Sequence, residues 1–376
     1  MKSYKNLYPK LCSFSNLEKA FEKAKEGKST LPYVLEFEKD FTNNLLLLKH
    51  ELETLTYSPK PLTRFVIHDP KTRVIRKSIF RDRIVHHAIV NILEPIYEKV
   101  FIDDSYANRV GKGTVAALQR FDRFQRKVSR NGTLVKCARN NNMIRGYAFK
   151  ADIKQFFDSV DQELLMHILR RKIKDRKVRE LICSILKNFH DKEKGMPLGN
   201  MTSQFFANVY LNELDYFVKH TLKMKYYLRY VDDFVIIHES KETLQECKEK
   251  IENYLVSLKL ELHQNKSKIF SMHSGIGLLG FRVFYYYKLL RKRNLAQFWK
   301  HLEDLEDQYT KETISGTRLF ICVQGWFSYA MWGNTYRLRK NIRKRIDKLI
   351  QENQEEMNKF SGDKYASQIL VIEKTC

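Results

Sequence analysis

Residues 226–239 are YYLRYVDDFVIIHE, a stretch in which Asp232 and Asp233 stand side by side between two apolar runs. The flanking tyrosine, valine and isoleucine residues favour β-strands, so the stretch predicts a hairpin with two carboxylates at its tip. Adjacent carboxylates repel each other, and a bound divalent cation removes that repulsion. An aspartate pair also occurs in turns that bind no metal, so this motif alone leaves both interpretations open.

A third acidic residue stands at the end of another predicted strand. In YAFKADIKQFF, residues 147–157, Asp152 follows an apolar run at the point where a loop begins. Enzymes that transfer phosphoryl groups use two divalent ions about 3.5–4 Å apart, and Mg²⁺ prefers carboxylate and phosphate oxygens. A two-metal site would need such a further carboxylate beside Asp232 and Asp233, and Asp152 is the candidate to bind two Mg²⁺ ions with them. A single aspartate at a strand end also occurs without a metal, so both interpretations stay open at this point.

The segments around these acids alternate between helical and extended patterns. Apolar residues at helical spacing predict helices at residues 37–55, 160–173, 202–222 and 241–258, and Asp161 is the expected N-cap of the second. Short β-like runs occur at 64–80, and residues 275–290 predict a hairpin. The chain from about residue 294 onward predicts basic helices. A mixed sheet backed by helices and followed by a helical tail is an α+β fold class.

The composition points to a polyanionic partner. The chain has 376 residues, 43% of them hydrophobic, and a formal net charge of +24. That charge favours nucleic acid first and an anionic membrane second. No apolar run is long enough to span a bilayer, and the start, MKSYKNLYPK, lacks the apolar core of a signal peptide. The six cysteines form no CxxC pair, so we expect reduced thiols in a cytoplasmic protein with no membrane partner.

Five motifs in order resemble the reverse transcriptase family over roughly residues 60 to 335. Beside the YVDD hairpin, four segments carry the resemblance: FKADIKQFFDSVD at 149–161, GMPLGNMTSQFFANVYLNELD at 195–215, LHQNKSKIF at 262–270 and LLGFRV at 278–283. The resemblance implies a right-hand polymerase fold. Residues 1–60 would be an N-terminal helical extension, 61–285 the fingers and palm, and 286–376 a basic helical thumb and tail.

The same resemblance implies an RNA-directed DNA polymerase that works by two-metal nucleotidyl transfer. Asp152, Asp232 and Asp233 match the family's catalytic metal ligands, and the Ile153 carbonyl is expected to add an oxygen. Mg²⁺ is the expected ion, with Mn²⁺ as a substitute.

Matching positions also predict the nucleotide site. Phe157 stands where the family keeps an aromatic steric gate against the ribose 2′-hydroxyl, which separates RNA from DNA building blocks. Lys71 and Arg73 match basic residues that contact the incoming triphosphate. Lys266 matches a lysine suggested to protonate the pyrophosphate leaving group. A core position for Phe157 and a solvated turn for Lys71 and Arg73 are the alternatives.

Leu198 and Gln204 indicate which subfamily of reverse transcriptases the chain resembles. An aliphatic residue followed by G-x-x-x-S-Q resembles reverse transcriptases of diversity-generating retroelements, in which that change accompanies low fidelity opposite template adenine. Related bacterial enzymes that act in phage defence share the same core. Residues 134–147 resemble an insertion relative to a minimal enzyme of that group, and the basic tail after about residue 336 is longer.

Basic runs predict the nucleic-acid contacts. YRLRKNIRKRIDK, residues 336–348, would form a cationic helix, although a solvated helix face is the alternative. The expected contacts are Gly280 of the primer-grip motif together with Arg337, Arg339, Lys340, Arg343 and Lys344.

The expected partners are an RNA template, a DNA or RNA primer, and dNTPs. We see no segment that resembles an RNase H or an integrase, so we expect a dedicated non-coding RNA and an accessory protein to serve the enzyme. Two other functions stay open: a non-catalytic RNA-binding protein on a polymerase fold, and an RNA-dependent RNA polymerase. A bulky gate at Phe157 argues against the second, because such an enzyme must admit ribonucleotides.

Overall fold

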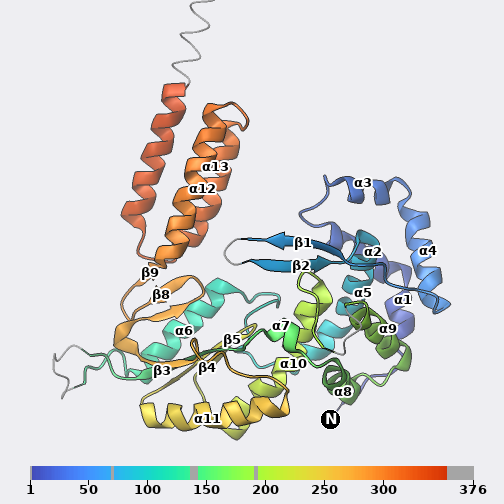
Figure 1. Ribbon diagram of the computed structural model, residues 1–376, viewed down its shortest axis with the longest axis horizontal. Helices are drawn as coiled ribbons and strands as arrows, with labels where there is room; N and C mark the ends of the chain where they lie inside the picture. The colour runs from blue at the N-terminus through green and yellow to red at the C-terminus, as the bar shows by residue number, and fades with distance from the viewer. Residues whose placement is uncertain (1, 69–71, 136–142, 190–193, 354–376) are drawn as a thin grey trace, which may run out of the picture. The chain divides into compact units, whose positions relative to one another are not determined.

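The computed structural model describes residues 2–68, 72–135, 143–189 and 194–353 (Figure 1). These residues form helices and antiparallel strand pairs, so the fold class is α+β, as the sequence predicts. None of the helices in these ranges is long and apolar enough to cross a membrane.

The chain divides into two compact units. The first combines Met1–Val128 with Gly146–Phe270, and the second combines Ser129–Arg145 with Ser271–Cys376. The second unit therefore contains the segment that resembles an insertion. The boundaries expected at residues 60 and 285, and the names fingers, palm and thumb, stay predictions.

The N-terminal part of the first unit is helical. Its helices are α1 (Tyr8–Cys12), α2 (Phe14–Lys25), α3 (Pro32–Lys39), α4 (Phe41–Glu53) and α5 (Phe80–Tyr97). The ring of Phe21 on α2 lies within 6 Å of the rings of Phe37, Phe41 and Phe80, so one aromatic cluster joins α2 to α3, α4 and α5. Each buried side chain of this size contributes about 1.5–3 kcal/mol of transfer free energy.

A two-stranded hairpin stands between α4 and α5 in the sequence. Strands β1 (Thr63–Ile67) and β2 (Arg73–Lys77) pair antiparallel, with Ile67 opposite Arg73. All residues of β1 are exposed, so the hairpin contributes little to the core. The turn that contains Lys71 lies outside the described residues.

The central sheet has the strand order β4-β5-β3-β6. Its strands are β3 (Tyr147–Asp152), β4 (Tyr227–Tyr230), β5 (Asp233–His238) and β6 (Lys268–Ser271). Strand β5 pairs antiparallel with both β3 and β4. Its inner residues are buried because helices pack on the sheet, among them α6 (Thr114–Val128) and α11 (Lys241–Ser257).

Further helices complete the first unit. They are α7 (Phe156–Ser159), α8 (Gln162–Lys172), α9 (Arg176–Lys187), α10 (Met201–Tyr216) and the π-helix Phe217–Thr221. Asp161 caps α8 as its side chain accepts a 2.8 Å hydrogen bond from the Leu164 amide, in line with the sequence. Helix α10 is buried over most of its length and packs on α5 and α8.

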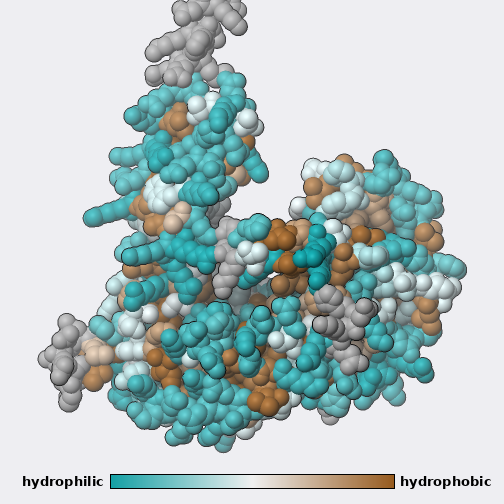
Figure 2. Space-filling view, viewed as in Figure 1, coloured by the Kyte–Doolittle hydropathy of each residue, from teal (hydrophilic) through white to brown (hydrophobic). Residues whose placement is uncertain are grey.

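The second unit contains a three-stranded meander and a helical bundle. Strands β7 (Ile276–Leu278), β8 (Phe281–Val283) and β9 (Lys288–Leu290) follow one another, and helices α12 (Lys292–Thr310), α13 (Gly316–Ala330) and residues 336–353 come next. The rings of Phe298 and Trp326 stack with centroids 3.5 Å apart in the bundle core. Figure 2 shows mainly hydrophilic side chains on the visible face of the bundle.

Candidate active site

The YVDD stretch forms the predicted hairpin turn. Strand β4 ends at Tyr230, β5 begins at Asp233, and the two turn residues between them are Val231 and Asp232. The antiparallel register places Asp233 opposite Asp152, the last residue of β3. In addition, the Ile153 amide donates a hydrogen bond of 3.3 Å to the Asp232 carbonyl. The structure thus brings together the three aspartates that the sequence singled out.

Asp152 is held from both sides of its backbone. Its amide donates to the Ser267 hydroxyl at 3.4 Å, and its carbonyl accepts from the His263 amide at 2.8 Å. Its carboxylate forms an ion pair with Lys266, whose Nζ lies 2.8 Å from Oδ2. Of the two lysines in LHQNKSKIF, the structure therefore brings Lys266 to the carboxylates, whereas Lys268 is exposed on β6.

This arrangement raises the pKa of the Asp232 carboxyl group. Burial, and after it the neighbouring charges of Asp233 and Asp152, raise its pKa to about 6. A carboxyl group with that pKa binds a proton more readily than an isolated one because burial and the two neighbouring carboxylates disfavour its charged form. A divalent cation would favour the charged form instead.

Asp233 has an unused oxygen. In the part of the chain that the structure describes, its buried Oδ1 atom accepts no hydrogen bond, and the Nζ atom of Lys150 approaches it only to 3.6 Å. A buried acceptor without a donor is costly unless a ligand satisfies it. Lys150, two residues before Asp152 on β3, was not among the residues expected from the sequence.

The donor chemistry of these residues fits Mg²⁺, a hard cation that prefers carboxylate oxygens. Among the described residues, however, no three acidic, histidine or cysteine side chains lie ready to hold a metal ion, and lysines stand beside Asp152 and Asp233 instead. The metal-ligand roles of the aspartates and of the Ile153 carbonyl stay predictions.

Phe157 follows the active-site strand on the short helix α7. It is half-buried, with its ring 5.3 Å from the ring of the fully buried Phe156. Its carbonyl accepts a hydrogen bond of 2.7 Å from the Met196 amide. Phe156 is a core residue and Phe157 packs against the same core, so the core position and the gate role of Phe157 both stay open.

The Leu198–Gly199 turn is fastened to strand β2. The Leu198 carbonyl accepts from the Arg76 amide at 3.0 Å, and the Asn200 side chain accepts from the Ser78 amide at 3.0 Å. Gly199 has φ +119°, and a Cβ there would lie 3.0 Å from the Ile75 side chain. The glycine thus permits the close approach of the two segments.

The predicted triphosphate residues are placed only in part. Arg73 stands at the first position of β2, opposite Ile67, and its side chain is exposed. Lys71 lies outside the described residues. The expected contact of these two residues with a triphosphate stays a prediction.

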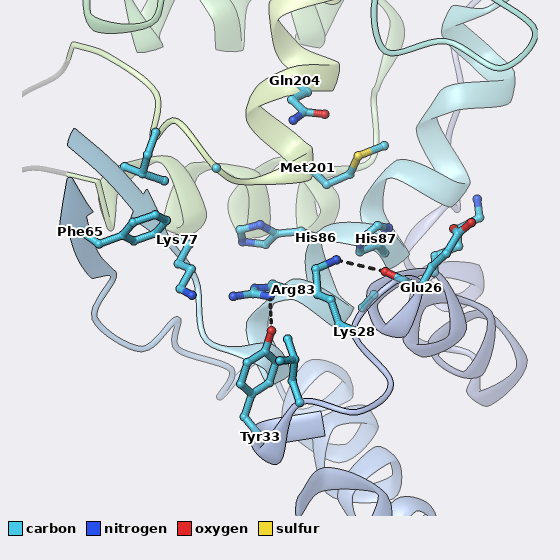
Figure 3. A pocket seen from close by; sticks show the side chains of 15 residues that line it. Glu26, Lys28, Tyr33, Phe65, Lys77, Arg83, His86, His87, Met201 and Gln204 are labelled. Atoms are coloured by element: carbon cyan, nitrogen blue, oxygen red, sulfur yellow. Dashed lines mark hydrogen bonds between the residues drawn. The ribbon is translucent and has the colours of Figure 1, made fainter. Parts of the chain in front are cut away.

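Gln204 lines a pocket of about 490 Å³ that the sequence did not reveal (Figure 3). Cationic and aromatic side chains from the N-terminal helices, the β1–β2 hairpin and α5 share its walls; they include Lys23, Lys28, Tyr33, Phe65, Lys77 and Arg83. In Figure 3 the Arg83 guanidinium reaches the Tyr33 hydroxyl, at 3.4 Å. Sequence patterns missed the pocket because it forms only when α2 folds back on α5.

The two histidines of this pocket carry little positive charge at neutral pH. Burial lowers the pKa of His86 to about 3, and the neighbouring His87 and Arg83 act in the same direction. Burial lowers the pKa of His87 to about 4, helped by Lys23 and Lys28. The lysines and Arg83 therefore supply the positive charge of the pocket at neutral pH.

In the second unit, Gly280 occupies the turn between β7 and β8. Its φ is +89°, and a Cβ there would lie 2.1 Å from the Tyr329 hydroxyl. Close packing against Tyr329 thus leaves no room for a larger residue at position 280. The contact of Gly280 with a primer stays a prediction.

The predicted basic helix lies at residues 336–353. Arg337, Lys340, Arg343 and Lys344 are exposed on it, whereas Arg339 is half-buried and donates to the Thr335 hydroxyl at 3.3 Å. Ile342 and Ile346 pack into the bundle core. The cations therefore line the outer side of an amphipathic helix, where they are free to meet phosphates.

Comparison with known proteins identifies the family. Residues 67–283, more than half of the chain, match the family described as reverse transcriptase (RNA-dependent DNA polymerase). The chain is also 28% identical to Protein YkfC of Escherichia coli (strain K12) over 295 residues, which cover 66% of this chain and 72% of YkfC.

Other relatives are intron proteins. Group II intron-encoded protein LtrA of Lactococcus lactis subsp. cremoris is 28% identical over 302 residues, covering 61% of this chain and 47% of LtrA. Nuclear intron maturase 1, mitochondrial, of Arabidopsis thaliana is 34% identical over 116 residues, covering 30% of this chain and 14% of the maturase. The chain thus spans about half the length of LtrA. With its α+β polymerase fold and the matched segment, the chain belongs to the reverse transcriptase family.

Proposed function

We propose that the chain is an RNA-directed DNA polymerase that copies a partner RNA into DNA. The observation that carries this proposal is the register that sets Asp152 opposite Asp233 and beside Asp232, in a member of the reverse transcriptase family. The orphaned Oδ1 atom of Asp233 and the raised pKa of Asp232 support a divalent cation at this point.

The three aspartates would hold two Mg²⁺ ions, with Mn²⁺ as a substitute. When bound, the ions supply charge neutralisation at the triphosphate and lower the pKa of the primer 3′-hydroxyl. Lys266, which forms an ion pair with Asp152, would give a proton to the leaving pyrophosphate. Phe157 would exclude a 2′-hydroxyl, and Lys71 and Arg73 would neutralise phosphate oxygens.

The partners follow from the charge of the chain. A template RNA, in our proposal a dedicated non-coding RNA, would meet the basic pocket beside Gln204, and the primer–template duplex would meet the helix at residues 336–353. A net charge of +24 supports tight, salt-sensitive binding of such polyanions. An accessory protein is a further expected partner.

For the biological setting we propose a diversity-generating retroelement or an anti-phage defence system. Leu198 followed by the G-x-x-x-S-Q run supports the first setting. Two of the relatives named above, LtrA and nuclear intron maturase 1, are intron proteins, so a role with intron RNA is the competing setting. Sequencing of the DNA products separates these settings, because errors clustered opposite template adenine would favour diversification.

Primer extension tests the activity. Purified protein is given an RNA template with an annealed DNA primer, Mg²⁺, and either dNTPs or rNTPs. We expect extension with dNTPs, and at least a thousandfold loss in Asp232→Asn with RNA binding unchanged, since a missing metal ligand removes several kcal/mol of transition-state stabilisation. Asp304→Asn, which removes an exposed carboxylate on α12, is the matched control.

The other outcomes point to other functions. Full activity in Asp232→Asn would remove the aspartates from the proposal. Extension with rNTPs alone would indicate an RNA-dependent RNA polymerase. RNA binding without extension on any supplied template, including the RNA that copurifies, would favour a non-catalytic RNA-binding protein.

A further inference from the structure

A fully buried arginine, Arg229, lies two residues before the turn of the aspartate hairpin. Arg229 belongs to strand β4, and its side chain has no exposed surface. It forms a two-pronged ion pair with Asp215 of α10, which is equally buried: Nε lies 2.7 Å from Oδ1, and Nη2 lies 2.7 Å from Oδ2. This geometry matches the guanidinium fork to the two carboxylate oxygens.

The remaining donors of Arg229 are all used. Nη2 also donates to the Ser105 hydroxyl at 3.1 Å, and Nη1 donates to the Asn208 side chain at 3.1 Å and to the Val231 carbonyl at 3.0 Å. An arginine has five N–H donors, and each one here has an acceptor. The side chain therefore has a single position, fixed by α10, by Ser105 and by the hairpin turn.

The contact with Val231 falls at a strained point of the backbone. Val231 has φ +55°, in the left-handed region that a β-branched residue rarely adopts. Such a conformation persists only where the surroundings impose it. The Val231 carbonyl belongs to the peptide group that leads into Asp232, and the carbonyl of Asp232 itself accepts from the Ile153 amide. Asp232 is therefore held by hydrogen bonds to the peptide groups on both of its sides.

We propose that Arg229 is a positioning residue that holds the Val231–Asp232 peptide, and so sets where the Asp232 carboxylate stands when the site binds a divalent ion. The proposal rests on the proposed function for its catalytic meaning. A purely structural ion pair in this place could be replaced by apolar side chains at little cost. Only the planar fork of arginine reaches Asp215 and the turn carbonyl at once, and lysine does not.

The test compares two arginine-to-lysine variants by Mn²⁺ binding. Arg229→Lys keeps the charge but loses the fork. Arg81→Lys is the matched control, because Arg81 also pairs with a buried aspartate, Asp82, with Nη1 3.3 Å from Oδ1. Among the described residues its other partners are Glu51 and the Tyr57 ring, away from the hairpin. Mn²⁺ binding is followed by electron paramagnetic resonance, and the specific site is the part of the binding that Asp232→Asn abolishes.

We expect Arg229→Lys to weaken the specific Mn²⁺ binding about tenfold, and Arg81→Lys to leave it unchanged, even if both variants melt at lower temperature. The loss should shrink to about threefold when Val231→Gly is present in both proteins, because glycine adopts a positive φ without the arginine. Equal Mn²⁺ binding in Arg229→Lys and wild type would overturn the proposal. So would a tenfold loss that is the same with and without Val231→Gly.

A milder variant covers the case in which Arg229→Lys does not fold. Ser105→Ala removes one acceptor of the guanidinium and is expected to weaken Mn²⁺ binding twofold to threefold; unchanged binding would overturn the proposal. Primer extension is measured in parallel. A wild-type protein that binds Mn²⁺ but extends no primer removes the proposed function and leaves this inference standing, whereas a wild type without the specific Mn²⁺ site overturns this inference.

Discussion

Single charges at the aspartate hairpin would affect how easily the proposed metal ions bind there. Lys150 lies 3.6 Å from the orphaned Oδ1 atom of Asp233, which is too far for a hydrogen bond but close enough for attraction. The lysine side chain is mostly buried, whereas the Asp233 side chain is about one-third exposed. Water therefore screens only part of the attraction. A metal ion that binds Asp233 must displace this ammonium group or share the carboxylate with it.

We predict that Lys150→Met lowers the Mg²⁺ concentration for half-maximal primer extension about threefold to tenfold. The methionine fills similar space without competing for the carboxylate. A titration of initial rate against Mg²⁺ checks this. Lys154→Met, four residues further along and paired with Glu261 instead, is the matched control and should leave the midpoint in place. A higher midpoint in Lys150→Met would mean that Lys150 assists the site.

The second prediction concerns the ring of Phe157. Phe157→Ala opens space beside the proposed nucleotide, so the preference for dNTPs over rNTPs should fall at least tenfold, which is about 1.4 kcal/mol of discrimination. Single-nucleotide incorporation with each sugar measures the preference. Phe157→Tyr keeps the ring and should keep the preference. An unchanged preference in Phe157→Ala would return Phe157 to a role in core packing.

Sequence patterns predict which strand or turn contains an aspartate, but they do not predict which side chains surround it. The apolar runs predicted a hairpin with Asp232 and Asp233 at its tip. The resemblance to reverse transcriptases added Asp152 to them, because the patterns alone left its role open. The positive φ of Val231, the approach of Lys150 and the five hydrogen bonds of Arg229 depend on tertiary packing, which no local pattern encodes.

Among the elements, α5 contains a histidine that stays neutral by burial. His86 is 2% exposed, and its Nδ1 lies 3.4 Å from the Thr202 hydroxyl of α10. Burial lowers its pKa most, and His87 and Arg83 lower it further. Its pKa is about 3 in the folded chain and about 6.5 when unfolded. Below pH 6.5 the unfolded chain therefore binds a proton that the folded chain does not.

It follows that His86 makes the protein lose stability as the pH falls below about 6.5, at about 1.4 kcal/mol for each pH unit. Between pH 7 and pH 5.5, urea unfolding should show about 1 kcal/mol more loss in wild type than in His86→Gln. The exposed His50 on α4 provides the control, because His50→Gln should follow wild type. Parallel losses in wild type and His86→Gln would contradict the buried, neutral histidine.

The elements themselves show where local signals suffice. The Asp161 cap was predictable because it depends on residues within one turn. The apolar face of α8 was predictable because its apolar residues recur at helical spacing. The stretch 275–290 gave only a hairpin, whereas the structure adds β9 as a third strand beside β8. Strand β9 is three residues long, and so short a run carries too few side chains to show a period.

For the whole molecule, composition predicts the partner class but not where it binds. The charge of +24 is spread along the sequence, and only folding brings lysines from the N-terminal helices to the pocket that Gln204 lines. At residues 336–353, by contrast, the helical period alone separates the cations from Ile342 and Ile346, which pack inward. That surface was therefore within reach of sequence reasoning.

The last prediction concerns salt. If the outer face of the helix at 336–353 contacts phosphates, each lost cation lowers the slope of log K against log salt by about 0.7 for single strands or 0.9 for a duplex. The variant carries alanine at the exposed positions Arg337, Lys340, Arg343 and Lys344. We expect the magnitude of the slope for a primer–template duplex to fall by about 3.6, with Mn²⁺ binding at the aspartates unchanged.

A control with the same change in net charge distinguishes direct contact from general attraction. It carries alanine at four exposed lysines of the first unit, Lys223, Lys225, Lys241 and Lys250. Because the bulk charge of both proteins is then equal, general attraction would lower the two slopes alike, whereas direct contact lowers only the slope of the helix variant. Duplex affinity measured by fluorescence anisotropy from 50 to 300 mM salt gives both slopes. Equal slopes would remove the helix from the nucleic-acid interface and leave its cations as a solvated face.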